Sequence, residues 1–210
     1  MNHPMTLSIS NAYTRQALSA TREVLGLKQL DGVLNQAGLE RLVGLSLPDD
    51  QAPALTTEEY ARFLEAVANL ISNPHAGRKL LRRIGQAWFA GVQRGQPLIF
   101  GLAQPVLSLL PLNRRIRFVL ESWVAALIRT NPGAEAWIEE ASLGIAYVEH
   151  TCPACFARQS NQPMCYLTQG ALDAAVHWAS GKRHAVQETE CRAAGAASCR
   201  FVIDFAPLPG

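Results

Sequence analysis

The sequence predicts an α+β fold in which helices pack on an antiparallel sheet. The first two thirds of the 210 residues carry apolar side chains at helical spacing, whereas strand-like alternation and turn residues follow Pro132. Helices first and strands afterwards are typical of an α+β domain rather than of a doubly wound one. We expect an N-terminal helical extension over residues 1–55 and the main domain over residues 56–210.

Five helices are predicted before Pro132, and they cover residues 11–25, 31–43, 56–72, 77–89 and 113–130. The first two show the weakest periodicity. Thr56 and Glu59 have the spacing of a capping box at the start of the third helix, and Asn73 with Pro74 ends it.

One helix and three strands are predicted after Pro132. The strands cover residues 144–150, 184–191 and 198–205, and the helix covers residues 165–180. Gly181 provides a stop signal for this helix. Alternate residues of the last strand share one face, namely Cys199, Phe201, Ile203 and Phe205.

Charge and cysteine usage limit the classes of function. The net charge is +2 with mixed signs, so we expect no nucleic-acid partner. The N-terminus lacks a basic segment followed by an apolar one, so no signal peptide is expected. All five cysteines lie between Cys152 and Cys199, and an odd, clustered set is typical of a reduced intracellular chain. We therefore expect a cytoplasmic protein.

Residues 95–113 contain no charged side chain. A membrane span is one interpretation, but three prolines and a length barely sufficient for about 30 Å of hydrocarbon favour a pair of short buried helices. The same stretch, together with a charged fraction of only 17%, suits the interface of a homodimer. We expect a homodimer without a membrane span.

The cysteines predict a structural zinc site, because zinc takes four ligands in a tetrahedron and accepts thiolates and carboxylates. Cys191 and Cys199 flank a tight connection between two strands, and Cys165 starts the preceding helix, where the helix dipole favours a thiolate. Glu188 or Glu190 can complete the site. An undistorted strand turns Glu188 and Cys191 to opposite faces, so Glu188 requires a bulge or an early strand end.

Cys152 and Cys155 form a second metal hook by their Cys-x2-Cys spacing, and they compete for the same role. A redox disulfide is another interpretation, although the βαβ context of thioredoxin-like chemistry is missing. Packing of small buried thiols is a third.

A longer motif surrounds these positions: Pro163-Met-Cys165-Tyr, Gly170, Trp178, Gly181, Glu188-Thr-Glu-Cys191-Arg-Ala-Ala-Gly195 and Cys199-Arg-Phe-Val-Ile. This motif resembles the signature of the 4-vinyl reductase (hydrocarbon-binding) domain family. The family is named for a proposed role in bacteriochlorophyll biosynthesis, and its domain also senses phenols in bacterial regulators of aromatic catabolism. The resemblance implies a ligand-binding fold similar to that of nitric-oxide sensors and Golgi transport-tethering subunits.

The resemblance also implies a ligand set for the metal. In the aromatic sensors, zinc is held by a cysteine before a helix and by Glu-x2-Cys-x7-Cys. These positions match Cys165, Glu188, Cys191 and Cys199 here, so the resemblance favours Glu188 over Glu190 and a structural zinc. Cys152 and Cys155 are absent from those sensors and become a possible accessory metal pair.

The function implied by the resemblance is a non-catalytic binding module for a small hydrophobic or aromatic molecule, with a hydrocarbon or a tetrapyrrole intermediate as candidate ligands. Side chains that can line its pocket are Trp88, Phe89, Phe100, Trp123 and Tyr147, with His150 and His177 as ionisable groups that can orient a ligand.

The alternative is a vinyl reductase or an accessory substrate carrier of (bacterio)chlorophyll biosynthesis, as the family name implies. Reduction needs an electron donor, and the sequence has no G-x-G-x-x-G motif after a strand. Four thiols can hold an iron–sulfur cluster, which visible absorption would reveal. Of the two, we expect the non-catalytic module.

Overall fold

The computed structural model describes residues 8–209. Its elements in chain order are β1 (Ser8–Ser10), α1 (Asn11–Leu25), α2 (Leu27–Gln36), η1 (Glu40–Leu42), β2 (Pro53–Thr56), α3 (Thr57–Asn69), α4 (Pro74–Gly95), α5 (Pro97–Ser108), α6 (Leu112–Thr130), β3 (Ala136–Ala141), β4 (Gly144–Glu149), α7 (Tyr166–Ser180), β5 (His184–Glu190), η2 (Arg192–Ala194) and β6 (Cys199–Pro207).

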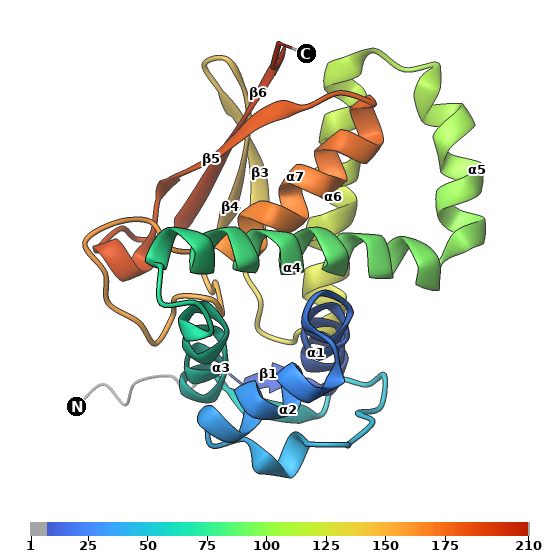
Figure 1. Cartoon of the computed structure of the whole chain (residues 1–210). Helices are drawn as coiled ribbons and strands as arrows, with labels where there is room; N and C mark the ends of the chain where they lie inside the picture. The colour runs from blue at the N-terminus through green and yellow to red at the C-terminus, as the bar shows by residue number, and fades with distance from the viewer. Residues whose placement is uncertain (1–7, 210) are drawn as a thin grey trace.

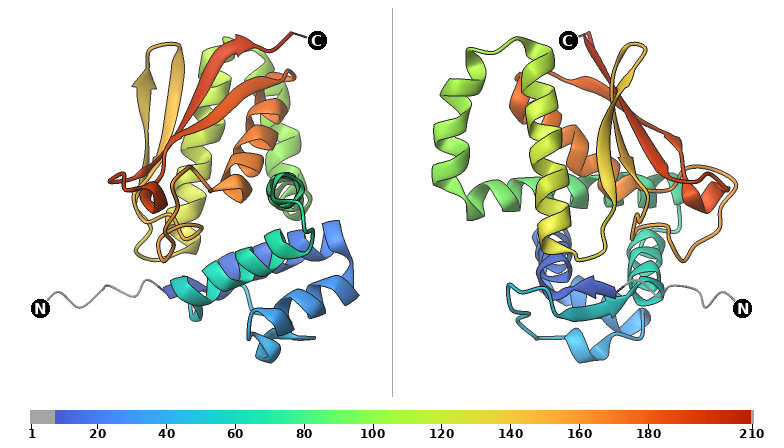
Figure 2. Two further views of the ribbon diagram at one scale, coloured as in Figure 1. Left: turned by 60° about the vertical axis from the view of Figure 1, so that its left-hand side comes forward. Right: turned by 180° about the vertical axis from the view of Figure 1, so that it is seen from behind.

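The predicted α+β fold is confirmed. Four antiparallel strands form one sheet in the order β3-β4-β6-β5. Helices α6 and α7 cover one face of this sheet, and the long helix α4 crosses α7 on the side away from the strands (Figures 1 and 2). The sheet and its helices therefore form the layers that carry the site described below.

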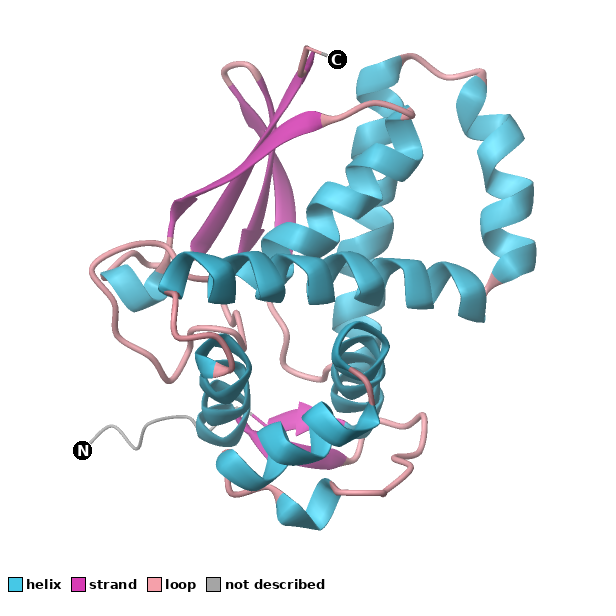
Figure 3. Ribbon diagram, in the orientation of Figure 1, coloured by secondary structure: helices cyan, strands magenta, loops and turns pink. Residues whose placement is uncertain are grey.

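A second group of elements lies beneath α4. Helices α1, α2 and α3 surround a small antiparallel sheet made of β1 and β2 (Figure 3). Strand β2 crosses the predicted domain boundary, and Ile9 and Tyr13 belong to the same hydrophobic core as Ile145 and Phe201. The division at residue 55 stays a prediction, and both parts of the chain share one core.

Local sequence signals place several elements where they were predicted. Thr56 and Glu59 form the capping box of α3 with both reciprocal hydrogen bonds. Helix α7 begins directly after Cys165 and ends at Gly181, whose φ of 71° is left-handed. In β6, Cys199, Phe201 and Ile203 alternate onto the buried face, as predicted.

The prediction that residues 95–113 form short buried helices is wrong. Helix α5 lies at the edge of the molecule, and its side chains Leu98, Leu102 and Leu109 are 78%, 74% and 85% exposed. Half-buried Phe100 connects α5 to the body, because its ring packs against Phe89 and Trp178 at centroid distances of 5.8 and 5.0 Å. None of the helices within residues 8–209 is long and apolar enough to cross a membrane.

Candidate ligand cleft and metal centre

All five cysteines meet at one end of the sheet. Cys152 and Cys155 lie in the loop after β4, Cys165 caps α7, Cys191 follows β5 and Cys199 begins β6. Every one is buried and none forms a disulfide. Three parts of the chain that are far apart in sequence thus bring their thiols together, as packing alone would not require.

The donor atoms form two sets of four. Cys165, Glu188, Cys191 and Cys199 make one set, and Cys152, Cys155, Cys165 and Cys199 make the other; within each set the donor atoms lie within 4.8 Å of one another. The Cys165 Sγ atom lies 3.7 Å from that of Cys199 and 3.9 Å from that of Cys191. This cluster can hold a metal ion, because zinc-type sites need four such donors around one point.

Glu188 reaches the thiols through a distortion of its strand. The register between β5 and β6 shifts between Glu188 and Glu190, and β5 ends at Glu190, so Glu188 and Cys191 can share one site. The Oε2 atom of Glu188 accepts a hydrogen bond of 2.8 Å from the backbone N–H of Cys165. Among residues 8–209 its buried Oε1 atom has no hydrogen-bond partner.

The surroundings of Glu188 favour a cation there. Burial raises the pKa of Glu188 to about 8, since its carboxylate is taken out of water without a positive partner. Glu190, the alternative ligand, is exposed and its carboxylate lies 3.8 Å from the Arg200 guanidinium instead.

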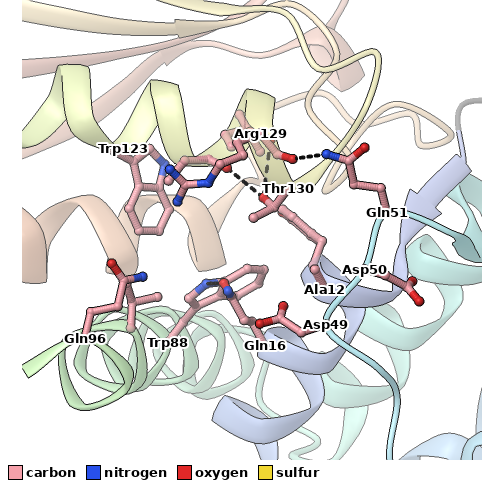
Figure 4. Close-up of a pocket in the computed structure, with 14 residues that line it drawn as sticks. Ala12, Gln16, Asp49, Asp50, Gln51, Trp88, Gln96, Trp123, Arg129 and Thr130 are labelled. Carbon is pink, nitrogen blue, oxygen red and sulfur yellow. Dashed lines mark hydrogen bonds between the residues drawn. The ribbon is translucent and has the colours of Figure 1, made fainter.

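A cleft of about 330 Å³ opens between α1, α4 and α6. Trp88 of α4 and Trp123 of α6 lie on opposite sides of it, with Gln96, Asp49 and Arg129 around them (Figure 4). The Nε1–H of Trp88 donates a hydrogen bond of 2.8 Å to Gln16, which fixes the orientation of this indole. The cleft therefore offers two aromatic walls and a polar mouth.

A small inner chamber of about 20 Å³ lies beyond the cleft, and Tyr13, Trp88, Trp123 and Leu127 line both. Its inner end carries Tyr147 and Glu149, with Leu167 and Thr168 of α7. Among residues 8–209 the buried hydroxyl of Tyr147 has no hydrogen-bond partner. Burial raises the pKa of Glu149 to about 7, so near neutral pH this carboxyl can donate or accept a hydrogen bond.

Two other hollows are larger, at about 490 and 470 Å³, but neither contains a tryptophan, tyrosine or phenylalanine in its lining. The first of these includes the exposed His177 between Arg82 and Arg183. Aromatic ligands gain from ring contacts, so these hollows are poorer candidates for them than the tryptophan cleft.

The predicted pocket residues separate into three places. Trp88, Trp123 and Tyr147 line the cleft or the inner chamber. Phe89 packs behind them, 6.4 Å from the Trp123 ring. His150 and His177 lie outside both spaces; Arg192 donates a hydrogen bond of 2.8 Å to the backbone oxygen of His150.

Two lining residues escaped the sequence analysis, Tyr13 and Glu149. Glu149 shares the alternation of Ile145 and Tyr147 along β4, and this two-residue period could have placed it on the core face. Tyr13 lies one helical turn before buried Ala17 on α1, but the weak periodicity of that helix hid its role.

The fold defines the class of protein. The structure is similar to H-NOX domains: a Tt H-NOX variant gives a TM-score of 0.61 at 13% identity, covering 96% of this chain and 98% of that chain. The Fe(II) unliganded H-NOX protein from K. algicida gives 0.59 at 12% identity, covering 93% and 96%, and the Fe(II)NO form of the S. oneidensis protein gives 0.55 at 12%, covering 90% and 97%. At these identities the similarity establishes an H-NOX-like fold.

A match to a sequence family provides the more particular identification. The 4-vinyl reductase domain family matches residues 145–205, which include Cys165, Glu188, Cys191 and Cys199. The expected relationship is therefore confirmed, and this part of the chain is a 4-vinyl reductase domain. A comparison of the sequence with curated proteins gives no match.

Proposed function

We propose that this chain is a non-catalytic module that binds a small hydrophobic or aromatic molecule in the cleft between Trp88 and Trp123. The observation that carries the proposal is the pair of facing indoles above a chamber that ends in Tyr147 and Glu149. A ring can stack or pack edge-on against the indoles, while a hydroxyl on it can reach the buried polar groups.

The volume of the cleft limits the ligand. About 330 Å³ lies at the lower end of the roughly 300–1,000 Å³ that ligand pockets occupy, which favours a molecule of one or two rings over a tetrapyrrole. The S. oneidensis H-NOX protein is in an Fe(II)NO state, and another similar structure concerns haem redox potential and porphyrin distortion.

A haem does not fit the lining of this cleft. None of the described lining residues is a histidine, cysteine or methionine, the usual haem ligands. Its tyrosine, Tyr13, has a pKa raised well above 10 by burial, which disfavours the phenolate that iron would need.

We also propose that Cys165, Glu188, Cys191 and Cys199 hold a structural zinc ion. The donor set suits zinc, and the unpartnered Oε1 of Glu188 needs a cation. Bound zinc supplies a cross-link between the start of α7 and the β5–β6 connection. Because the first turn of α7 carries Leu167 and Thr168 into the inner chamber, this cross-link also fixes the chamber wall. Five reduced thiols fit the cytoplasm, where we place the protein.

A matched pair of substitutions on α6 tests the cleft. Ala126 lines the cleft and Ala125 beside it is exposed, so Ala126→Phe fills the cleft while Ala125→Phe adds the same ring elsewhere. We expect Ala126→Phe to weaken phenol or indole binding at least about tenfold, or about 1.4 kcal/mol, in calorimetric titration. Ala125→Phe should bind like the wild type. Equal weakening by both, or no saturable binding of phenols, indoles or fatty acids to the wild type, would reject the cleft.

The exposed apolar stripe of α5 supports a homodimer as a further proposal. Leu98, Leu102, Val106 and Leu109 recur at helical spacing on one face of a helix without charged residues, so a second copy can pack there in twofold symmetry without charge repulsion. Light scattering should give about twice 22.9 kDa for the wild type. Leu102→Glu should give the monomer, whereas Gln104→Glu on the other side of α5 should stay dimeric. A monomeric wild type would refute the dimer.

A further inference from the structure

We propose that the cysteine cluster holds two zinc ions that share Cys165 and Cys199 as bridging ligands. The inference rests on the zinc site proposed above and adds a second ion, held by Cys152 and Cys155. Each ion then has four ligands, and no donor of the cluster is left without a metal.

The two sets of donors have the composition that such a centre requires. Both sets contain Cys165 and Cys199, and each adds two donors of its own. One zinc ion takes Cys152 and Cys155 as terminal ligands, and the other takes Glu188 and Cys191. A thiolate has several lone pairs and can bind two zinc ions at once, so two tetrahedra can share the edge between the two common sulfurs.

The distances between sulfur atoms agree with this arrangement. Two sulfurs of a zinc tetrahedron with bonds of about 2.3 Å lie about 3.8 Å apart. The shared pair, Cys165 and Cys199, is separated by 3.7 Å, Cys165 and Cys191 by 3.9 Å, and Cys152 and Cys165 by 3.5 Å. Cys155 and Cys199 are closer, at 3.1 Å, and must separate slightly when a metal enters.

A single ion would leave buried donors without a partner. An ion on Cys165, Glu188, Cys191 and Cys199 leaves the thiols of Cys152 and Cys155 buried beside a filled site. An ion on the four-cysteine set leaves Glu188, which is only 6% exposed and whose Oε1 atom has no partner among residues 8–209. A buried carboxylate without a cation is costly, so the second ion satisfies a group that the first cannot.

Metal stoichiometry tests the proposal directly. The full chain is purified without chelators, loaded with zinc chloride, desalted and measured by native mass spectrometry and elemental analysis. We expect two zinc ions per wild-type chain and one in the Cys152→Ser/Cys155→Ser double variant. Cys191→Ser should also retain one, because it leaves the four-cysteine set intact.

Cobalt distinguishes shared from separate sites. With one Co²⁺ per chain the protein should give a strong paramagnetic resonance signal, and a second Co²⁺ should diminish it, because bridging thiolates couple the two spins. One zinc per wild-type chain would overturn the second ion and leave the first site standing. No zinc would overturn both, as would stoichiometric iron with visible absorption. Two cobalt ions with independent, additive signals would refute the bridging.

Discussion

Replacing Cys199 by serine is expected to remove all bound metal and to destabilise the chain more than any other single cysteine substitution except that of Cys165. Cys199 belongs to both donor sets and is fully buried at the start of β6. Structural zinc contributes an apparent 10–16 kcal/mol in small zinc domains, so we expect a loss of roughly 5 kcal/mol or more in the free energy of unfolding. Urea denaturation monitored by circular dichroism measures this loss.

Cys191→Ser is the matched control for Cys199→Ser. It makes the same chemical change in the same cluster, but it leaves Cys152, Cys155, Cys165 and Cys199 in place. We expect an intermediate stability and retained metal. A Cys199→Ser variant that unfolds at the wild-type urea concentration and lacks metal would show that the cluster does not stabilise the fold.

Gly170→Ala is expected to have the second large effect. Helices α4 and α7 cross so closely that a Cβ atom on Gly170 would lie 2.0 Å from the backbone oxygen of Arg82, and one on Gly85 would lie 2.0 Å from that of Leu167. Backbone atoms cannot move aside as side chains do, so the helices must separate. We expect either substitution to cost about 3 kcal/mol or more in the free energy of unfolding.

Gly91→Ala on the same helix α4 provides the control for these two glycines. Its added Cβ would meet nothing closer than the Arg94 side chain at 3.9 Å, and alanine favours a helix over glycine by about 0.8–1.0 kcal/mol. Thermal unfolding should show Gly91→Ala to be as stable as the wild type or more so. Similar destabilisation by Gly91→Ala and Gly170→Ala would mean that close helix packing is not the cause.

The elements with strong local signals could be predicted from the sequence, whereas those set by tertiary contacts could not. The capping box of Thr56 and the left-handed Gly181 are local, and both lie where predicted. Strand β3 was missed because it is an edge strand whose side chains, including Trp137, are largely exposed, so its apolar alternation is weak. The exposure of α5 was missed because apolar composition alone does not reveal whether a helix is covered.

The metal centre was more predictable than the ligand cleft. Thiols at recognisable spacing indicate a common site even when a strand distortion is needed to bring Glu188 to it, and that distortion is present between Glu188 and Glu190. Aromatic residues carry no such signal, because any of them can fill a core. Which of them face the cleft depends on how α1, α4 and α6 cross, and this explains why Tyr13 was missed while His150 was considered.

The central claim is that a zinc-filled cysteine cluster supports a cleft for a small aromatic molecule. A crystal structure of the zinc-loaded chain with phenol, collected at the zinc absorption edge, tests both parts at once. We predict two anomalous peaks among the five Sγ atoms and a phenol ring between Trp88 and Trp123. A well-ordered structure without anomalous signal at the thiols, and with a cleft that stays empty at high phenol concentration, would contradict the account.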